Sequence, residues 1–181
     1  YALQLASALS GSGIRVYSQW DMGTTAAAVD AWREDPSSVL VGTRSLMTGV
    51  DAPGDTCSLV IVDRIPRAAG NPVDDARIED IMARTDLGKW EADRFVYVAD
   101  AALLLKQAVG RLIRTTTDSG VVAIMDPRLP RKGVTISAPA RKVYVDVAAD
   151  FAATKSRTTD RQTVLDFLAD RRTSRADKSA A

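Results

Sequence analysis

The stretch LLLKQAVGRLIRTTTDSGVVAIMDPRLP, residues 103–130, decides the fold. Its first half continues an apolar pattern with helical spacing, which predicts a helix over residues 99–115. After a short polar segment, residues 121–125 form an apolar run that predicts a buried strand. A helix that leads directly into a buried strand is typical of an α/β fold.

The polar face of this helix is unusual for a core element. Its members lie three or four residues apart and therefore share one side: Gln107, Gly110, Arg111 and Arg114. The opposite side is apolar and suited to packing on a sheet: Leu105, Val109 and Leu112. A glycine inside a helix costs about 1 kcal/mol relative to alanine, which the close approach of a ligand or another surface would justify. Two guanidinium groups one turn apart suit a polyphosphate, and the alternative is an exposed face whose arginines pair with carboxylates.

Apolar strands alternate with helices along most of the chain. Strands are expected over residues 14–17, 38–43, 58–63 and 121–125. Helices are expected over residues 1–10, 24–34, 72–86, 99–115 and 160–169, with one more within 139–153. Residues 171–181 are expected to be disordered. The alternation favours an α/β fold with a mostly parallel central sheet flanked by helices on both faces.

Polar residues follow three of the expected strands. They are Gly42-Thr43-Arg44, Asp63-Arg64 and Asp126-Pro127-Arg128. Ligands gather at the carboxyl ends of strands in parallel sheets, so we expect these groups to line one rim. Asp63 and Asp126 superficially imitate a metal-binding acidic motif. We interpret both as strand-end aspartates that cap the chain or pair with the neighbouring arginines.

The composition excludes several classes of chemistry. The 181 residues include one cysteine, Cys57, and no histidine. An internal disulfide and imidazole acid–base catalysis are therefore excluded, and a cysteine–histidine metal site is not expected. Cys57 is interpreted as a small buried apolar residue, and a reducing cytoplasm fits this composition. No apolar run is long enough to span a bilayer, so no membrane partner is expected.

The formal net charge of +1 conceals an asymmetry between the two ends. Residues 1–127 carry 12 basic and 17 acidic side chains, whereas residues 128–181 carry 12 basic and 6 acidic ones. Such a basic end suits nucleic acid, and the alternative is a solvated tail. The chain begins at Tyr1 within an apparent helix, so we expect it to be part of a longer polypeptide.

Two motifs connect these features to a known family. QAVGRLIR, residues 107–114, resembles motif VI of superfamily 2 helicases in the form typical of the DinG and XPD branch. VLVGTRSLMTGVDAPGDTCSLVIVDRIP, residues 39–66, resembles motif V of that branch and the strand after it. DSGVVAIMDPRL and TTDRQTVLDFL resemble the strand that follows motif VI and the C-terminal helix. The resemblance covers residues 24–130 and 158–168, with both motifs in the family's order.

The resemblance implies the second, C-terminal RecA-like motor domain of an ATP-dependent DNA helicase. The motor domain would cover residues 1–153, and residues 154–181 would form a C-terminal helix and a basic tail. ATP and Mg²⁺ would be bound mainly by an N-terminal RecA-like domain, because this chain has no G-x-x-x-x-G-K-[ST] phosphate loop. This chain alone is therefore expected to be inactive, and one cysteine cannot hold the family's four-cysteine iron–sulfur cluster. The partners implied are that first domain and single-stranded DNA, in a cytoplasmic, nucleoid-associated protein.

The resemblance also implies roles in ATP hydrolysis. Arg114 would be the arginine finger, Arg111 a second contact to the γ-phosphate, and Gln107 the group that polarises or senses it. Three further residues would lie near the nucleotide: Gly110, Gly49 and Asp51. No residue of this chain is expected to be a direct metal ligand.

Motif V would supply the contacts to DNA. Gly42, Thr43 and Arg44 would meet a DNA phosphate through backbone amides and side chains. Met47 and Thr48 stand where the branch usually has an aromatic residue and a glutamate. A second hypothesis therefore stays open, namely a non-hydrolysing RecA-like module that binds nucleic acid or a partner. A third, a flavodoxin-like small-molecule binder, would leave the order of the motifs unexplained.

Overall fold

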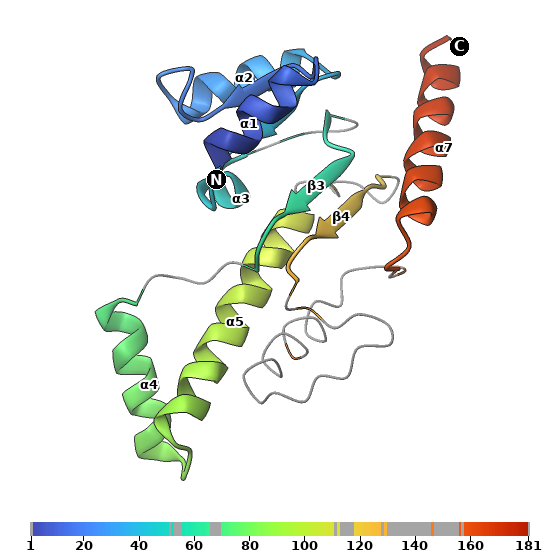
Figure 1. Cartoon of the computed structure of the whole chain (residues 1–181). Coiled ribbons are helices and arrows are strands. Elements are labelled where there is room, and N and C mark those ends of the chain that lie inside the picture. The colour runs from blue at the N-terminus through green and yellow to red at the C-terminus, as the bar shows by residue number, and fades with distance from the viewer. Residues whose placement is uncertain are drawn as a thin grey trace.

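The computed structural model describes residues 2–50, 52, 56–65, 70–110, 112, 118–127, 129, 146, 156 and 158–180. Helices and strands alternate along most of the chain (Figure 1). In chain order they are α1 (Ala2–Gly11), β1 (Val16–Ser18), α2 (Thr25–Glu34), β2 (Val39–Val41), α3 (Ser45–Gly49), β3 (Leu59–Val62), α4 (Pro72–Arg84), α5 (Lys89–Val109), β4 (Val121–Ile124) and α7 (Arg161–Ala180). None of the described helices combines the length and apolar character that a bilayer crossing requires.

The described strands form two parallel pairs. β1 pairs with β2, with Val16 opposite Val39, and β3 pairs with β4, with Leu59 opposite Val121. No hydrogen-bonded ladder joins the two pairs among the described strands. The predicted α/β class is therefore confirmed. A single RecA-like central sheet flanked by helices on both faces stays a prediction.

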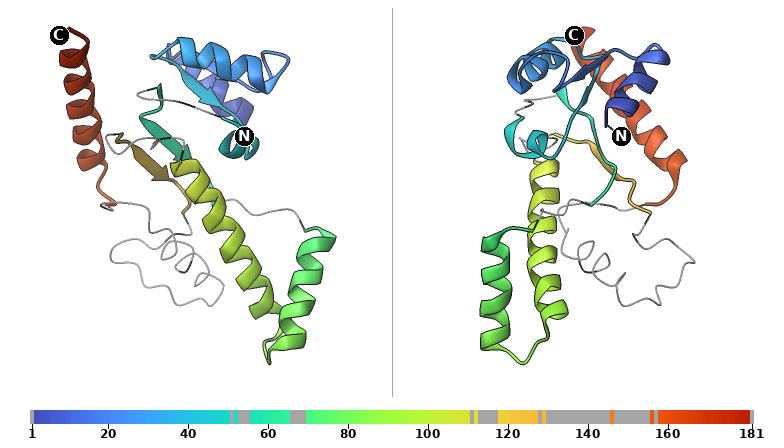
Figure 2. Two further views of the ribbon diagram at one scale, coloured as in Figure 1. Left: turned by 180° about the vertical axis from the view of Figure 1, so that it is seen from behind. Right: turned by 60° about the vertical axis from the view of Figure 1, so that its left-hand side comes forward.

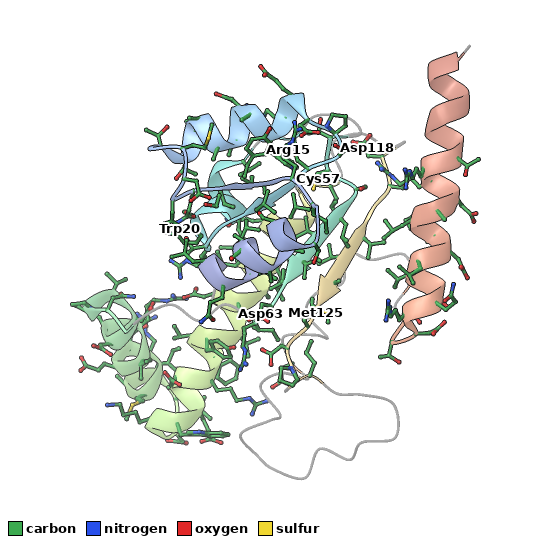
Figure 3. All side chains as sticks on the ribbon, turned by 45° about the horizontal axis from the view of Figure 1, so that its top comes forward. Arg15, Trp20, Cys57, Asp63, Asp118 and Met125 are labelled. Atoms are coloured by element: carbon green, nitrogen blue, oxygen red, sulfur yellow. The ribbon has the colours of Figure 1, made fainter. Side chains whose placement is uncertain are left out.

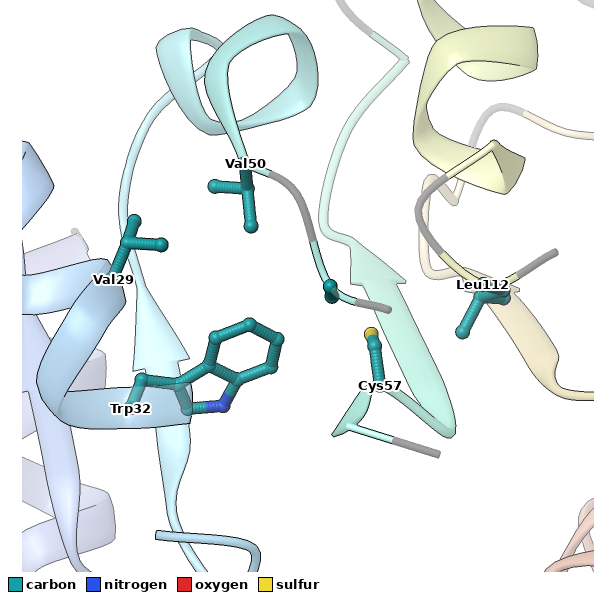
Figure 4. Packing of buried hydrophobic residues seen from close by; sticks show 6 residues of the cluster. Val29, Trp32, Val50, Cys57 and Leu112 are labelled. Atoms are coloured by element: carbon teal, nitrogen blue, oxygen red, sulfur yellow. The ribbon is translucent and has the colours of Figure 1, made fainter. Parts of the chain in front are cut away.

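A shared apolar core connects the two strand pairs (Figure 4). Its buried members are Val29, Trp32, Val50, Ala52, Cys57 and Leu112. Partly buried residues of all four strands pack against them, among them Tyr17, Leu40, Val60 and Val122. Cys57 is buried as the sequence predicts, and this burial raises the pKa of its thiol. The two pairs therefore depend on one core for their relative placement.

The longest helix, α5, packs on the second strand pair. Tyr97, Ala101 and Leu105 of α5 form a buried cluster with Val62 and Ile65, which lie at and after the end of β3. The first half of α5 forms a hairpin with α4 that extends away from the strands, whereas α7 stands separately beside β4 (Figures 1 and 2). The hairpin thus leaves only the second half of α5 to cover the sheet.

The caps of α2 and α4 explain why these helices begin where they do. Thr24 Oγ1 accepts a hydrogen bond from the Ala27 backbone N–H at 3.2 Å, as predicted for an N-cap at this site. Asn71 Oδ1 accepts from the backbone N–H groups of Val73 and Asp74, both at 3.0 Å, and Pro72 occupies the first turn. Each cap satisfies donors that the first turn of a helix leaves without an internal partner.

Three boundaries differ from the sequence prediction by more than two residues. The helix predicted over residues 99–115 spans Lys89–Val109. It begins earlier than predicted because Gly88 caps its start and the helix continues through Ala99. Gly110 is therefore the C-cap of α5 and not a glycine in its middle. The helix predicted to end at residue 169 continues to Ala180, in a segment without glycine or proline. Of the helix predicted within 139–153, only Asp146 lies among the described residues, where it pairs with Arg94.

Candidate functional site

The strands run in the same direction, so their carboxyl ends lie toward one edge of the molecule, which is called the carboxyl rim. Residues that precede strands, Arg15, Cys57 and Asp118, gather at one end of the sheets (Figure 3). Residues that follow strands, Trp20, Asp63 and Met125, lie toward the other end. Parallel pairing requires this arrangement within each strand pair, and Figure 3 shows that the two pairs point the same way. The rim is where ligand contacts are expected in α/β folds.

Thr43 and its neighbours lie at the end of β2 and are held by a residue that follows β1. Gln19 Oε1 accepts hydrogen bonds from the Thr43 backbone N–H at 3.0 Å and from Thr43 Oγ1 at 3.2 Å. Ser45 Oγ donates to the same oxygen at 3.4 Å and lies 3.2 Å from Thr43 Oγ1. The Gln19 backbone N–H donates to the Val41 carbonyl at 3.4 Å and so continues the β1–β2 ladder. The Thr43 segment, residues 42–45, is thus anchored to β1.

Gly42 is closely packed against the side chains of Leu46 and Gln19. A Cβ atom on Gly42 would lie 2.3 Å from Leu46 Cδ1 and 2.8 Å from Gln19 Oε1. Contacts this short force the neighbouring side chains to move, so even alanine would disturb the hydrogen bonds of Gln19. The sequence suggested a backbone contact to a ligand at Gly42. The structure supplies a packing reason for the glycine in addition.

Arg44 is exposed and lines a groove of about 330 Å³ between α3, α4 and α5. Asp74 and Asp100 lie on the other side of this groove, where Arg77 pairs with both at 3.2 Å. Hydrogen bonding to Asp100 raises the pKa of the Arg77 guanidinium. Both carboxylates of the groove are thus engaged by Arg77, and Arg44 is the other basic residue beside it.

The aspartates that follow β3 and β4 have structural partners. Asp126 is 3% exposed, and its Oδ2 accepts a hydrogen bond from the Ile65 backbone N–H at 3.0 Å. Asp63 Oδ2 lies 3.8 Å from Arg64 Nε, with both side chains largely exposed. The predicted pairing of Asp63 with Arg64 is confirmed, and Asp126 caps the backbone N–H of Ile65, whereas a pairing of Asp126 with Arg128 stays a prediction. Arg128 lies outside the described residues.

The predicted ATP residues are described only in part. Gln107 is half-buried near the end of α5, and the predicted apolar side is confirmed for Leu105 and Leu112, which are 0% and 2% exposed. Gly49 ends α3 and Gly110 caps α5. Three predicted residues lie outside the described residues: Asp51, Arg111 and Arg114. Their roles, and those of Gln107, Gly49 and Gly110, stay predictions.

Gln19 was not predicted from the sequence. A signal for it existed, because the rule that ligand groups follow parallel strands applies to the first strand as well as to the other three. Its contact with Thr43 spans 24 positions along the chain and is visible only in three dimensions.

The described residues show no metal centre. Within the described ranges, no group of three or more cysteines and carboxylates could hold a metal ion. The sequence contains no phosphate loop. Arginines fit the outer oxygens of a triphosphate, whereas the residues needed to hold Mg²⁺ and the inner phosphates would have to come from elsewhere.

Comparison with known proteins finds that this chain matches one protein family. Residues 2–140 match the family described as Helicase C-terminal domain. The ATP-dependent DNA helicase YoaA of Haemophilus influenzae is 39% identical over 138 residues, which cover 75% of this chain and 19% of that protein. The ATP-dependent helicase DinG of Mycobacterium tuberculosis is 43% identical over 109 residues, or 59% of this chain and 16% of that protein. The 3'-5' exonuclease DinG of Bacillus subtilis is 31% identical over 132 residues, or 72% and 14%. The chain therefore spans less than a fifth of the length of these relatives.

Proposed function

Since this chain belongs to the helicase C-terminal domain family, with DinG and YoaA helicases among its relatives, we propose that it is the second motor domain of an ATP-dependent DNA helicase. The observation that carries this proposal is the family match over residues 2–140, which contains both motif V and motif VI. The domain would have a RecA-like fold and close against an N-terminal RecA-like domain of the same polypeptide. With such a role, the protein would be cytoplasmic and associated with the nucleoid.

The proposed contribution to hydrolysis is electrostatic. Negative charge spreads over the γ-phosphoryl oxygens in the transition state of phosphoryl transfer, and guanidinium groups stabilise it. Arg114 would act as the arginine finger, Arg111 as its companion, and Gln107 would sense the γ-phosphate. ATP would also approach Gly110, Gly49 and Asp51, while the first domain would hold Mg²⁺. Because the finger engages only when the domains close, hydrolysis would be coupled to domain motion.

The proposed contribution to DNA binding comes from the Thr43 segment. Thr43 and Arg44 are exposed at the carboxyl end of β2, with hydroxyl and guanidinium donors that suit a phosphate oxygen. Both the backbone N–H and the hydroxyl of Thr43 donate to Gln19 Oε1, so Arg44 would make the main phosphate contact, and Thr43 would bind a phosphate only by exchanging these bonds. Gly42 would let the DNA backbone approach the end of β2 closely.

The first test is ATP hydrolysis by the full polypeptide with and without single-stranded DNA. We expect DNA to stimulate hydrolysis, and we expect this 181-residue chain alone to hydrolyse ATP no faster than a blank. A full polypeptide that binds DNA but hydrolyses nothing would contradict the motor proposal. It would support the alternative, a non-hydrolysing RecA-like module that binds nucleic acid or a partner.

We expect this chain to bind single-stranded DNA weakly and in a salt-dependent manner. Each phosphate contact made by a lysine or arginine releases counterions, so the logarithm of the affinity should fall by roughly 0.7 per contact for each tenfold rise in salt. The check is fluorescence anisotropy of a labelled oligothymidylate at several salt concentrations. Equal affinities at low and high salt would contradict binding through Arg44 and the basic residues after position 128.

A further inference from the structure

The ends of β3 and β4 are joined by a side chain that continues their ladder. The Met125 backbone N–H, one residue beyond β4, donates to the Val62 carbonyl at 2.8 Å. Asp126 Oδ2 then accepts from the Ile65 N–H at 3.0 Å, a contact between residues that lie 61 positions apart. The carboxylate thus takes the place of a backbone acceptor after β4 has ended.

Asp126 is an unusual residue for this position. It is 3% exposed, and among the described residues it is the charged side chain that is buried. A buried carboxylate is unfavourable unless hydrogen bonds compensate for the lost water, so its presence here needs a specific reason. Its backbone carbonyl is used as well, because it accepts from the Leu129 N–H at 3.1 Å. Asp126 therefore holds two other residues, Ile65 and Leu129.

Both of these residues belong to the core beneath α5. Ile65 is a buried member of the cluster, and Leu129 packs against it from a partly buried position. The α5 members of the cluster are Tyr97, Ala101 and Leu105. They lie four residues apart and therefore form one face of the helix. The contacts of Asp126 thus determine the surface on which this face of α5 rests.

This surface lies next to motif VI and also supports motif V. A helix that is packed along one face cannot easily rotate or slide, so the residues that follow take their direction from it. Gln107, the first residue of motif VI, follows Leu105 by two positions. Met47 of α3, within motif V, packs against the same cluster. Both motifs therefore depend on the core that Asp126 holds.

We infer that Asp126 is a positioning residue for ATP hydrolysis, because its carboxylate holds Ile65 and thereby sets the placement of α5 and of motif VI. This inference rests on the proposed role of motif VI. Asp126 touches neither ATP nor DNA and acts through the cluster alone. A displacement of a catalytic group by roughly 1 Å can lower a rate by about 100-fold, so a distant hydrogen bond can have a large effect.

Two substitutions at Asp126 separate the hydrogen bond from the charge. Asp126→Ala removes the acceptor for the Ile65 N–H, whereas Asp126→Asn keeps an oxygen of the same reach. Asp63→Ala is the matched control, because Asp63 follows β3 as Asp126 follows β4, is largely exposed, and carries the same charge. All variants are made in the full polypeptide, and circular dichroism verifies the fold. Should Asp126→Ala not fold, Asp126→Ser replaces it, since its hydroxyl ends one bond short of the position of Oδ2.

The first measurement is steady-state ATP hydrolysis at saturating single-stranded DNA. We expect Asp126→Ala to lower kcat by about tenfold to 100-fold, with the KM for ATP changed by less than about threefold. Asp126→Asn should retain most of the activity, because its carboxamide oxygen can accept the same hydrogen bond. Asp63→Ala should hydrolyse ATP like the wild type. Equal losses of kcat in Asp126→Ala and Asp126→Asn would show that the charge matters and not the bond to Ile65, and the inference would be wrong.

The second measurement is amide hydrogen exchange, which requires no hydrolysis. We expect Asp126→Ala to accelerate exchange in residues 101–110 of α5 by about tenfold or more, and in residues 26–34 of α2 by less than about twofold. The same acceleration in both helices would reveal a general loss of stability and would overturn the inference. An active wild type with an equally active Asp126→Ala variant refutes the inference alone. A wild-type polypeptide that hydrolyses no ATP refutes the proposed function, on which the inference rests.

Discussion

Replacing Arg114 with alanine is expected to lower DNA-stimulated ATP hydrolysis by about 10³-fold or more, which is the effect typical of an arginine finger. The guanidinium would face charge that develops only in the transition state, so its loss should lower kcat more than it raises the KM for ATP. Arg114→Lys should restore little, because an ammonium group lacks the planar fork that binds two phosphoryl oxygens together.

The measurement is steady-state ATP hydrolysis by the full polypeptide at saturating single-stranded DNA. Arg84→Ala is the control, because Arg84 is an exposed residue of α4 that pairs with Asp80 at 2.7 Å, away from motif VI. We expect the control to hydrolyse ATP like the wild type, while DNA binding by Arg114→Ala persists. An Arg114→Ala protein that is folded and hydrolyses ATP as fast as the wild type would show that the arginines of motif VI have a structural role only.

Local signals in the sequence predicted many of the elements. The helix predicted over residues 24–34 is found at Thr25–Glu34, where Thr24 is the N-cap through a contact over three residues. The apolar runs predicted β2, β3 and β4 to within two residues. Such features depend on neighbours along the chain, which the sequence displays directly.

The sequence prediction was wrong about the two ends of α5, and it missed contacts between residues that lie far apart along the chain. Ala99 is a good helix former, so α5 passes through it from Lys89, although the predicted helix began at this residue. Gly110 was interpreted as a gap in the middle of a helix, and its position as a C-cap follows only from where α5 ends. Gln19 and Gly42 are joined by packing across two strands, which no local pattern reports.

Replacing Trp32 with alanine is expected to lower the free energy of unfolding by about 3–5 kcal/mol. Trp32 is 8% exposed, and its indole reaches from α2 toward Cys57, into the core that the two strand pairs share (Figure 4). No ladder of hydrogen bonds connects these pairs among the described strands, so packing has to hold them together. The loss should therefore approach the upper part of the range for a buried aromatic residue.

Urea unfolding followed by circular dichroism measures this effect, with Trp90→Ala as the matched control. Trp90 is 53% exposed near the start of α5, so its replacement should change the stability by less than about 1 kcal/mol. Equal losses in the two variants would show that the shared core does not hold the strand pairs together.

The core of Trp32 also includes Val50 and Leu112, which are neighbours in sequence of Asp51 and Arg111. A loosened core should therefore displace motifs V and VI together, and we expect Trp32→Ala to weaken DNA-stimulated hydrolysis at temperatures where the protein is still folded.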